Sequence, residues 1–510
     1  MEKAYKKNKL NNILIIGIIV ILSISIIIFN LVLNNKKDDS KNIKSVEDAK
    51  KSTIAVLTGS SAESLAHVLF KDAEIKTYNL NSDAMYAVEV GNVKYGMALK
   101  FAVDDYNRKR DNALMLVGDS LRDSASGIFF ARNEKNKIIL PKFNEFLAKI
   151  KENGEFKIIE DRWFGDDSNI ITFDFESLDS KNGIIVYAID ATYPPYTYVY
   201  NNSFVGFDVE LVYRFCEKYN YGLDVKAVDF SGMLPGIKSG KFDLGGGGNT
   251  ITEERKKSVD FSDPVKSSQM FLYAKNDNKK LTISDTVTKI KESIRITFIE
   301  ENRYQLFLRG LITTIFMAFA SMVLGTLLSF VICIFRLLGG KVANKICDAY
   351  VSILQGIPIV VLLLLFYYII FKSNAIPAEY VAIVAFTLNF SAYVSEILIT
   401  AIRSIDIGQW EAAYALGFGY MHTFLRFIFP QSLVSAIPVY KGEIISLIKS
   451  TAIVGYIAVQ DLTKMSDIVR SRTFEPFIPL ITVAIIYYLF ALIVTNLLNK
   501  FILKVDWKKR

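Results

Sequence analysis

The chain has 510 residues, of which 51% are hydrophobic and 22% are charged, and its mean hydropathy is +0.27. An ordinary soluble protein is less apolar than this, and a chain that lies wholly in a membrane carries less charge. We therefore expect the apolar residues in separate membrane segments. Lysines and arginines beside those segments largely explain the net charge of +8, and no basic patch with aromatic residues indicates nucleic-acid binding.

The first apolar run lies near the N-terminus. Residues 13–34 are long enough to cross the ~30 Å hydrocarbon core of a bilayer as a helix. Four lysines precede this run: Lys3, Lys6, Lys7 and Lys9. The positive-inside rule places residues 1–12 in the cytoplasm. Because neither a small-residue cleavage site nor a lipid-accepting cysteine follows, we expect an uncleaved transmembrane signal anchor at 13–34 and a linker at 35–51.

No run between residues 35 and 303 is long enough to span a membrane. Short alternating strands and helical patterns follow one another there, which predicts an α/β region outside the membrane. Cys216 is the only cysteine in this region, so no disulfide within it is expected. The two histidines, His67 and His422, lack the spacing of metal ligands, and no metal site is predicted.

Five further apolar runs predict an all-α polytopic membrane domain at 306–504. They lie near residues 308–335, 351–371, 380–402, 433–459 and 476–503. Basic residues follow the first and the last run, so both chain termini, including the tail 505–510, are expected in the cytoplasm. The α/β region then faces outward, and the anchor and the five runs give about six crossings.

A loop at 403–431 carries the first family signature. It contains EAAYALGFGYMHTFLRFIFPQ, in which Gly417 follows EAA after three residues and Pro430 lies thirteen residues further on. This spacing resembles the EAA loop of ABC importer permeases, and GQWEAA with FPQ resembles the polar amino acid (histidine/glutamine) type. RGLITT, LQGIPIVVLLLLFYY, SAYVSEILITAI and KGEIISLIKSTAIVG extend the resemblance over residues 309–503.

The resemblance implies that this loop forms a short coupling helix that docks on an ABC ATPase subunit. The residues implied in coupling are Glu411, Ala412, Ala413, Gly417 and Pro430. An amphipathic helix on the membrane surface is the alternative for this loop. The sequence has no GxxxxGK[ST] phosphate loop. We therefore expect no cofactor in this chain, ATP and Mg²⁺ in a separate subunit, and a second permease copy or a sister permease to complete the pore.

Two segments of the outward region resemble the lobes of periplasmic amino-acid-binding proteins. Residues 183–276 carry YPPY, GFDVEL, IKSGKFDL, TITEERK and VDFSDP and resemble the first lobe. Residues 52–165 run from STIAVLTGSSAESL to NGEFKIIEDRWFG and resemble the second lobe, including its closing helix near 143–150. This order is the reverse of the family order. The resemblance implies one circularly permuted α/β two-lobed clamp with a linker at 166–182 and a connector at 277–305; two truncated domains are the alternative.

The same resemblance implies a ligand site between the lobes. Arg255, with Thr250 and the Ser60–Ser61 pair, would hold a carboxylate, and Gly248 would offer a backbone carbonyl. The side-chain pocket would be lined by Asp190, Tyr193 and Tyr196. A solvated Arg255 and tyrosines that belong to the core are the alternatives. Asp208 is expected to cap the helix that begins in GFDVEL.

One position departs from the family. Amino-acid-binding proteins place an aspartate in lobe two that pairs with the ammonium of the ligand, and Leu99 occupies that place here. A buried ammonium without an anion is costly. Either a nearby carboxylate such as Asp104 or Asp190 takes over this role, or the ligand is not an ordinary α-amino acid.

Together these features predict a multi-pass permease subunit of an ABC importer in the bacterial cytoplasmic membrane, with its own solute-binding domain outside. Its solute would be a small polar molecule such as an amino acid, and the chain itself would not be an enzyme. A ligand-sensing membrane receptor with the same clamp is the alternative.

Overall fold

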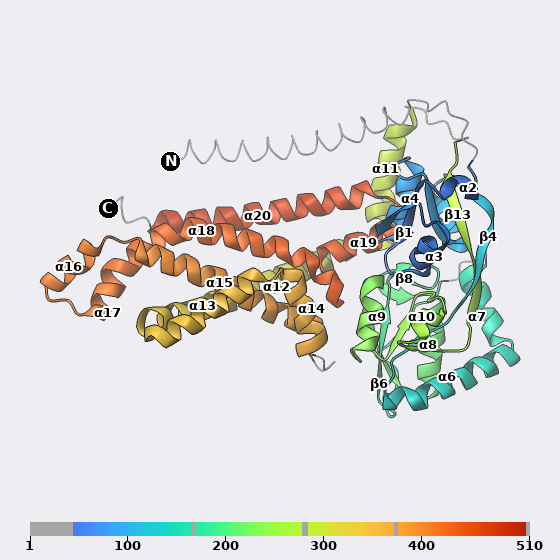
Figure 1. Cartoon of the computed structure of the whole chain (residues 1–510), viewed down its shortest axis with the longest axis horizontal. Helices are drawn as coiled ribbons and strands as arrows, with labels where there is room; N and C mark the ends of the chain where they lie inside the picture. Colours follow the sequence, from blue (N-terminus) through green and yellow to red (C-terminus); the bar gives the residue numbers. More distant parts are fainter. Residues whose placement is uncertain (1–43, 166–169, 278–283, 372–375, 506–510) are drawn as a thin grey trace. The chain divides into compact units, whose positions relative to one another are not determined.

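The computed structural model describes residues 44–165, 170–277, 284–371 and 376–505, and Figure 1 labels many of their helices and several of their strands. These residues form two compact units. Unit 1 runs as far as Gln305 and also includes Ser466–Ile485, whereas unit 2 holds Leu306–Met465 and the residues from Ile486 onward. The predicted signal anchor at 13–34 lies outside the described residues.

Unit 1 contains two α/β lobes, and we call lobe two the one that the chain enters first. Its sheet has the order β2-β1-β3-β13-β4, with β1, β2 and β3 parallel and β13 antiparallel to both of its neighbours. The strands are β1 (Thr53–Leu57), β2 (Glu74–Tyr78), β3 (Tyr95–Leu99), β4 (Leu114–Ser126) and β13 (Lys266–Lys275), and the helices are α2 (Val46–Ala49), α3 (Ser61–Leu69), α4 (Asn81–Glu89) and α5 (Lys100–Lys109).

Both faces of this sheet are buried, as is usual where crossover helices join parallel strands. Along β1, Ile54 and Val56 belong to one hydrophobic cluster and Ala55 to another, because successive side chains of a strand point to opposite faces. Sequence runs such as TIAVL therefore form a fully buried strand rather than an alternating one.

Lobe one has a second sheet, of order β10-β6-β11-β5-β12, and a small antiparallel sheet, β7-β8-β9. Its strands are β5 (Phe129–Phe130), β6 (Ile184–Ile189), β7 (Thr192–Tyr193), β8 (Thr197–Tyr200), β9 (Ser203–Val205), β10 (Gly222–Ala227), β11 (Leu244–Gly246) and β12 (Asp260–Phe261). Its helices include α8 (Phe207–Lys218), α9 (Phe230–Lys238) and α10 (Glu253–Lys256).

The predicted closing helix packs on lobe one. It is part of α6 (Glu134–Glu152), which runs beside α8 in Figure 1 and is followed by α7 (Glu155–Phe164). The ring centroids of Phe143 and Phe146 lie 5.1 and 5.8 Å from that of Phe215 on α8. The apolar spacing in FNEFLAKI thus indicated the correct buried face, and the prediction that this helix closes lobe one is confirmed.

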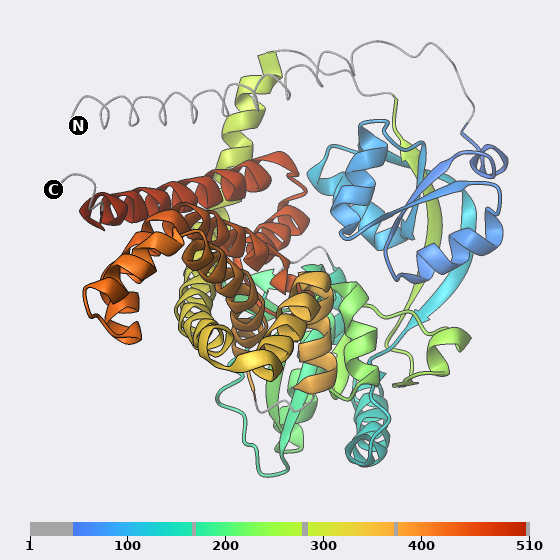
Figure 2. The ribbon, with the colours of Figure 1, turned by 60° about the vertical axis from the view of Figure 1, so that its left-hand side comes forward.

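The sheet orders correct the predicted lobe boundaries. The range 52–165 was expected to form lobe two with its closing helix, yet β5 belongs to the sheet of lobe one; the range 183–276 was expected to form lobe one, yet β13 lies in the sheet of lobe two. The chain therefore crosses between the lobes twice, after β4 and before β13, and Figure 2 shows these two long strands side by side. Short strands such as Phe129–Phe130 carry too few residues to show a pattern. That this connectivity is a circular permutation stays a prediction.

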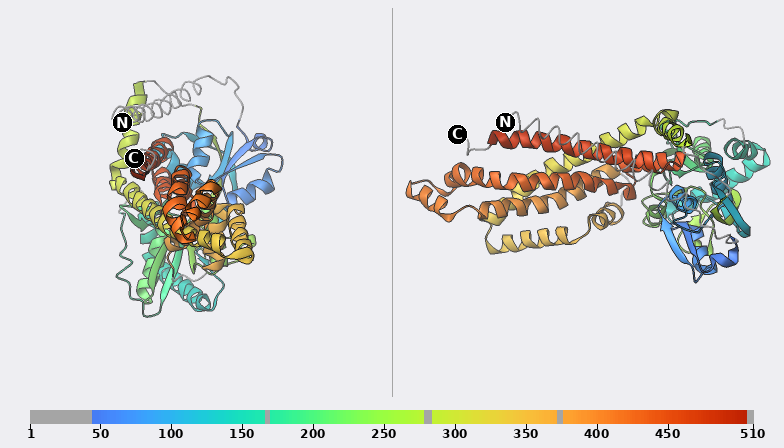
Figure 3. Two further views of the ribbon diagram at one scale, coloured as in Figure 1. Left: turned by 90° about the vertical axis from the view of Figure 1, so that its left-hand side faces the viewer. Right: turned by 90° about the horizontal axis from the view of Figure 1, so that it is seen from above.

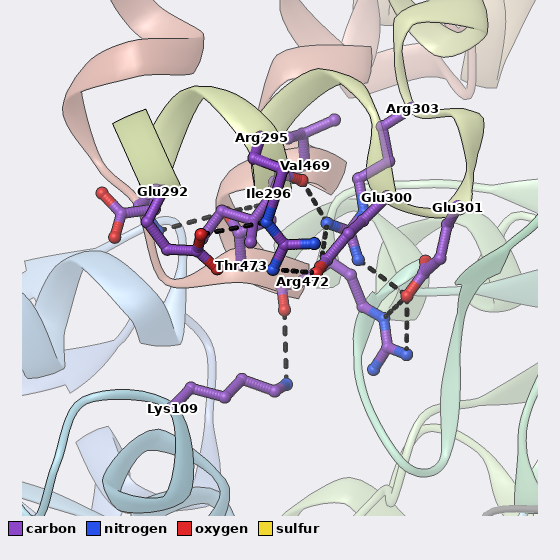
Figure 4. A network of polar contacts seen from close by, with 11 residues as sticks. Lys109, Glu292, Arg295, Ile296, Glu300, Glu301, Arg303, Val469, Arg472 and Thr473 are labelled. Atoms are coloured by element: carbon purple, nitrogen blue, oxygen red, sulfur yellow. Dashed lines mark hydrogen bonds and ion pairs between the residues drawn. The ribbon is translucent and has the colours of Figure 1, made fainter. Parts of the chain in front are cut away.

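A segment distant in sequence completes unit 1. Residues 466–477, which we call the junction segment, comprise most of α19 (Leu462–Thr473) and the turn that leads into α20 (Phe477–Val505). Figure 4 shows Arg472 of this segment beside Glu301, with a nitrogen–oxygen distance of 3.1 Å, and Lys109 of lobe two donating to the Arg472 carbonyl at 3.3 Å. Glu301 lies in the 3₁₀ turn η1 (Glu300–Asn302) after α11 (Ser284–Phe298). No local pattern in the sequence predicts this association.

Unit 2 is helical, and its helices lie side by side in both views of Figure 3. Among the described residues, three helices are long and apolar enough to cross a membrane, or up to five if each of two bent pairs forms one span. The higher number agrees with the five predicted runs. The helices are α12 (Tyr304–Leu338), α13 (Gly340–Gly356), α14 (Ile359–Leu365), α15 (Ala378–Arg403), α16 (Ile407–Ala415), α17 (Tyr420–Thr423) and α18 (Phe429–Ser450), followed by α19 and α20.

Polar contacts join neighbouring helices of unit 2. Ser321 on α12 donates a hydrogen bond of 3.4 Å to the backbone carbonyl of Ile383 on α15. Arg336 near the end of α12 pairs with Glu396 on α15 at 2.6 Å and with Asp348 on α13 at 2.8 Å. Because Arg336 has an acidic partner on each of two other helices, it joins three helices to one another.

Candidate functional site: an interlobe cavity

A cavity lies between the two lobes of unit 1. It contains about 430 Å³ of empty space, including the part that opens to solvent. Lobe two contributes the ends of β1 and β3 and the start of α3, and lobe one contributes the loop after β11 and helix α10. The lining residues are Leu57, Ser60, Ser61, Ala62, Asn81, Met97, Ala98, Leu99, Tyr193, Phe230, Gly247, Gly248, Thr250, Arg255 and Met270.

Arg255 provides the one cationic side chain of this lining. Only 9% of the residue is exposed, and its guanidinium donates to the backbone carbonyls of Thr250 at 3.2 Å and of Gly59 at 2.8 Å. The latter bond crosses from lobe one to lobe two. Burial lowers the pKa of the Arg255 guanidinium to about 10. Among the described residues, no carboxylate pairs with it, so its remaining N–H donors are available to an anion.

The hydroxyls predicted beside Arg255 also lie at this cavity. Ser61 donates to the hydroxyl of Thr250 at 3.0 Å, a second contact between the lobes. Ser60 caps α3 by accepting from the backbone N–H of Glu63 at 3.2 Å. Because Ser60, Ser61 and Ala62 line the cavity, α3 presents its N-terminus to it, where free N–H groups and the helix dipole favour an anion.

Asp208 holds the glycine loop after β11 through two hydrogen bonds. The N–H groups of Gly247 and Gly248 both donate to Oδ2 of Asp208, at 2.8 and 2.9 Å. The prediction that Asp208 caps α8 is therefore wrong, since Gly206 is the N-cap and Asp208 lies in the first turn. Asp208 is 1% exposed, and burial raises the pKa of its carboxyl to about 6.

The three residues predicted for the side-chain pocket occupy different places. Tyr193 lines the cavity, and its ring stacks on that of Tyr196 with a centroid distance of 6.1 Å. Tyr196 does not line it, because its ring lies behind Gly248 and meets Phe101 and Phe164 at 5.1 and 5.2 Å. The alternative that the tyrosines are core residues thus holds for Tyr196.

The acidic residues considered as substitutes also lie away from the lining. Asp190 is buried and accepts from the N–H and the hydroxyl of Thr192, at 3.0 and 2.5 Å, as in a local turn. Asp104 lies on α5 in a half-exposed pair with Lys100 at 2.8 Å. Leu99, by contrast, lies at the end of β3 and lines the cavity.

Several lining residues were not predicted. Leu57 and Leu99 end parallel strands, and ligands in open α/β sheets bind beyond the carboxyl ends of such strands, so this signal was present in the sequence. Met97, Asn81, Phe230 and Met270 carried no comparable signal, because the sequence does not show which residues the closure of two lobes brings together.

The predicted coupling loop lies in unit 2 and forms α16, α17 and the π-helical turn η3 (Phe424–Ile428) before α18. Glu411, Ala412 and Gly417 are exposed, Ala413 is buried, and Pro430 lies in the first turn of α18. Gly417 has φ +82°, and no atom lies within 4 Å of a Cβ placed there. Large apolar side chains are exposed on this loop, among them Ile407 (72%) and Leu416 (76%).

These two units define a class of protein: a helical membrane domain on the same chain as a two-lobed solute-binding clamp. The family model of bacterial extracellular solute-binding proteins, family 3, matches residues 185–456. This match begins in lobe one and continues into unit 2.

Known permeases are similar to this chain as well. The arginine transport system permease protein ArtQ of Bacillus subtilis (strain 168) is 33% identical over 190 residues, which cover 37% of this chain and 87% of that protein. The L-cystine transport system permease protein TcyB of the same strain is 31% identical over 182 residues, 35% of this chain and 78% of that protein. A chain in a crystal structure of an amino acid ABC transporter with histidines is 31% identical and covers 44% of this chain and 100% of that chain, with a TM-score of 0.37.

The chain therefore belongs to the bacterial extracellular solute-binding proteins of family 3 and to the ABC importer permeases of the polar amino acid type, joined in one polypeptide. It is a multi-pass membrane protein.

Proposed function

We propose that this chain imports a small carboxylate solute, such as an amino acid or a related molecule, with ATP hydrolysis supplied by a separate subunit. The observation that carries the proposal is the buried guanidinium of Arg255 at the interlobe cavity of a chain that also contains a permease domain. A fixed arginine fork suits a planar carboxylate. The names of the relatives, which transport arginine or L-cystine, support an amino acid or a similar solute.

The transport cycle follows from the two crossings between the lobes. Strands β4 and β13 lead into adjacent crossings, where Ile128 and Ser262 exchange hydrogen bonds of 3.0 Å. Such paired crossings permit a hinge motion that opens and closes the cavity. We expect unit 1 outside the cytoplasmic membrane, both termini in the cytoplasm, and a binding domain that stays at high effective concentration because it is fused to its permease.

The coupling loop supports an ATPase partner. Its exposed apolar side chains form a patch of the kind that marks protein interaction sites, and Gly417 leaves open space at a left-handed backbone position. A docking surface of this kind needs no phosphate loop in the chain itself. A second copy of the chain or a sister permease would complete the pore.

A charge substitution at the coupling loop tests this proposal. Gly417→Asp and Gly417→Asn place side chains of the same size at the same backbone position, and asparagine and aspartate both tolerate positive φ. We expect Gly417→Asp to reduce solute uptake in cells and copurification of the ATPase, with Gly417→Asn affected less and solute binding unchanged in both. A chain that binds solute but copurifies with no ATPase and supports no uptake would favour the receptor alternative.

A further inference from the structure

We propose that the interlobe cavity selects a carboxylate that carries no ammonium group and has a small, mainly apolar body. This inference rests on the proposed function, because it names the solute class of the same cavity. It follows from the balance of charge in the lining and from the places of the acidic residues around it.

The lining can neutralise one negative charge and no positive charge. Arg255 is cationic, and the other lining side chains of the described residues are hydroxyl, amide or apolar groups without an aspartate or glutamate. A bound carboxylate would bring the buried site to neutrality. A zwitterionic amino acid would add an ammonium and leave a net positive charge away from water, which is unfavourable.

The carboxylates nearest in the fold lie outside the lining. Oδ2 of Asp208 accepts from Gly247 and Gly248, its Oδ1 is buried without a hydrogen-bond partner among the described residues, and Asp208 is not part of the lining. Asp190 accepts from Thr192, and Asp104 pairs with Lys100 at the surface. An ammonium in the cavity would therefore have no anion from these residues without rearrangement of the loop or of the turn.

Two of the neutral acceptors that could stabilise an ammonium are also engaged. The carbonyls of Gly59 and Thr250 already accept from the Arg255 guanidinium. The ring of Phe230 lies over the same guanidinium, at 5.6 Å from its central carbon to the ring centroid. A second cation near this ring would face the charge of Arg255.

The rest of the lining indicates the body of the solute. Met97, Leu99 and Met270 belong to a hydrophobic core cluster of lobe two, and together with Leu57 they present apolar groups to the cavity. Such a wall favours an aliphatic or aromatic body over a charged one. The geometry thus separates the cavity into an anion-binding end at Arg255 and the start of α3, and an apolar wall from lobe two.

Matched pairs of solutes test the proposal on the purified full chain in lipid nanodiscs. Propionate, 3-methylbutanoate, 4-methylpentanoate and 3-phenylpropanoate are compared with L-alanine, L-valine, L-leucine and L-phenylalanine by calorimetry. For the pair that binds best, we expect the ammonium-free acid to bind about 100-fold more tightly. Equal or tighter binding of the amino acid would overturn the inference and leave the proposed function standing.

A pair of variants at Leu99 tests the charge argument directly. Leu99→Asp adds a carboxylate to the lining, and Leu99→Asn adds an equally polar side chain without the charge. We expect Leu99→Asp to weaken binding of the ammonium-free acid and to strengthen binding of the matching amino acid, each by about tenfold or more relative to Leu99→Asn. If both variants changed the two solutes equally, charge would not control selection and the inference would be wrong.

The same measurements separate this inference from the proposed function. Binding of no acid or amino acid in the panel, or binding that Arg255→Gln leaves unchanged, would contradict the assignment of the cavity and both proposals with it. Because the comparison of solute pairs uses the unaltered chain, it stands even where a Leu99 variant fails to fold.

Discussion

Lobe one and lobe two have sheets of similar size but bring different chemistry to the cavity. Lobe one supplies Arg255, Thr250, Tyr193 and the glycine loop, which are groups for polar recognition. Lobe two supplies mainly the apolar wall, together with Asn81 and the hydroxyls at the start of α3. The one charged side chain of the lining therefore comes from lobe one, whereas the wall from lobe two is mostly apolar.

The contacts with the junction segment have the opposite distribution. In lobe two, Asp83 pairs with Arg470 and Arg110 pairs with Glu475, the latter at 3.2 Å. Phe474 completes a hydrophobic cluster of lobe two, with its ring 4.9 Å from that of Tyr106. Lobe one meets the segment through Tyr198, over which Arg472 lies at 4.8 Å. This difference indicates that lobe one, which carries Arg255, is held less by the junction segment than lobe two is, so we expect closure to move lobe one more than lobe two.

The largest effect is expected for Arg255→Gln, which removes the charge of lobe one from the cavity. Binding of the best solute should weaken by about 1000-fold, or about 4 kcal/mol, because the buried carboxylate of the solute loses its partner. Calorimetry on the full chain provides the measurement. Arg108→Gln in lobe two is the control, since the Arg108 side chain is 67% exposed and lies on α5 away from the lining. If the two variants bound the solute with equal affinity, the charge of Arg255 would not distinguish lobe one from lobe two in solute binding.

A change at Glu210 should destabilise lobe one alone. Glu210 is fully buried on α8, where it pairs with Arg162 and accepts from the indole N–H of Trp163 at 2.7 Å. Glu210→Ala leaves these α7 groups without their acceptor and should cost about 3 to 5 kcal/mol. Hydrogen exchange should show lost protection in α7 and α8 but not in the sheet of lobe two.

The control for this prediction is Glu145→Ala on α6. Glu145 pairs with Lys149 four residues on, and both side chains are more than half exposed, so the change should stay within about 0.5 kcal/mol. If Glu210→Ala reduced protection equally in both lobes, the lobes would unfold as one unit and the assignment of α7 to lobe one alone would be wrong.

Phe474→Ala tests the hold of the junction segment on lobe two. The ring is 7% exposed and packs on Tyr106 and Lys109, so truncation should cost about 3 kcal/mol, through lost burial and a cavity. We expect hydrogen exchange to rise in α5 and in the junction segment, with lobe one and solute binding little changed. Ile158→Ala, at a side chain on α7 with 62% exposure, is the control. Unchanged exchange in α5 would show that lobe two does not depend on this segment.

The sequence predicted what local pattern and spacing determine. Apolar spacing gave the buried face of the closing helix with Phe143 and Phe146, and family motifs gave Arg255, Thr250, Ser61 and Gly248 at the cavity. It did not give the true lobe boundaries, because strands of two or three residues show no periodicity and their pairing is decided by distant segments. The contacts of residues 466–477 were missed for the same reason, since no local pattern links Arg470 to Asp83.

The role of Asp208 was missed because capping was the simplest reading of an acidic residue at a helix start. Instead, this carboxylate accepts a hydrogen bond from the backbone of the glycine loop, about 40 residues away in sequence. A polar group at the start of a helix pairs with the N–H groups that the tertiary structure brings to it, and here these belong to the glycine loop and not to α8. The tertiary structure, and not the local sequence, decides the partner of Asp208.

The smallest effect is expected from a change of pH at Asp208 in lobe one. Burial raises the pKa of this carboxyl from 3.8 to about 6, so the folded chain holds the proton more tightly than the unfolded chain. Stability from this group is therefore greatest below about pH 4, falls as the pH rises toward 6, and has been lost above it, a change of at most about 3 kcal/mol. Asp208→Asn removes this dependence, so the thermal midpoint of the variant relative to that of the unaltered chain should be higher at pH 7.5 than at pH 4.5.

Asp224→Asn is the control, at a partly exposed carboxylate paired with Lys226 at 2.8 Å in the same lobe. The thermal midpoint of this variant should differ from that of the unaltered chain by the same amount at both pH values. If the Asp208→Asn difference were equally constant, Asp208 would not titrate in this range, and the polar half of the cavity would not depend on pH through its glycine loop.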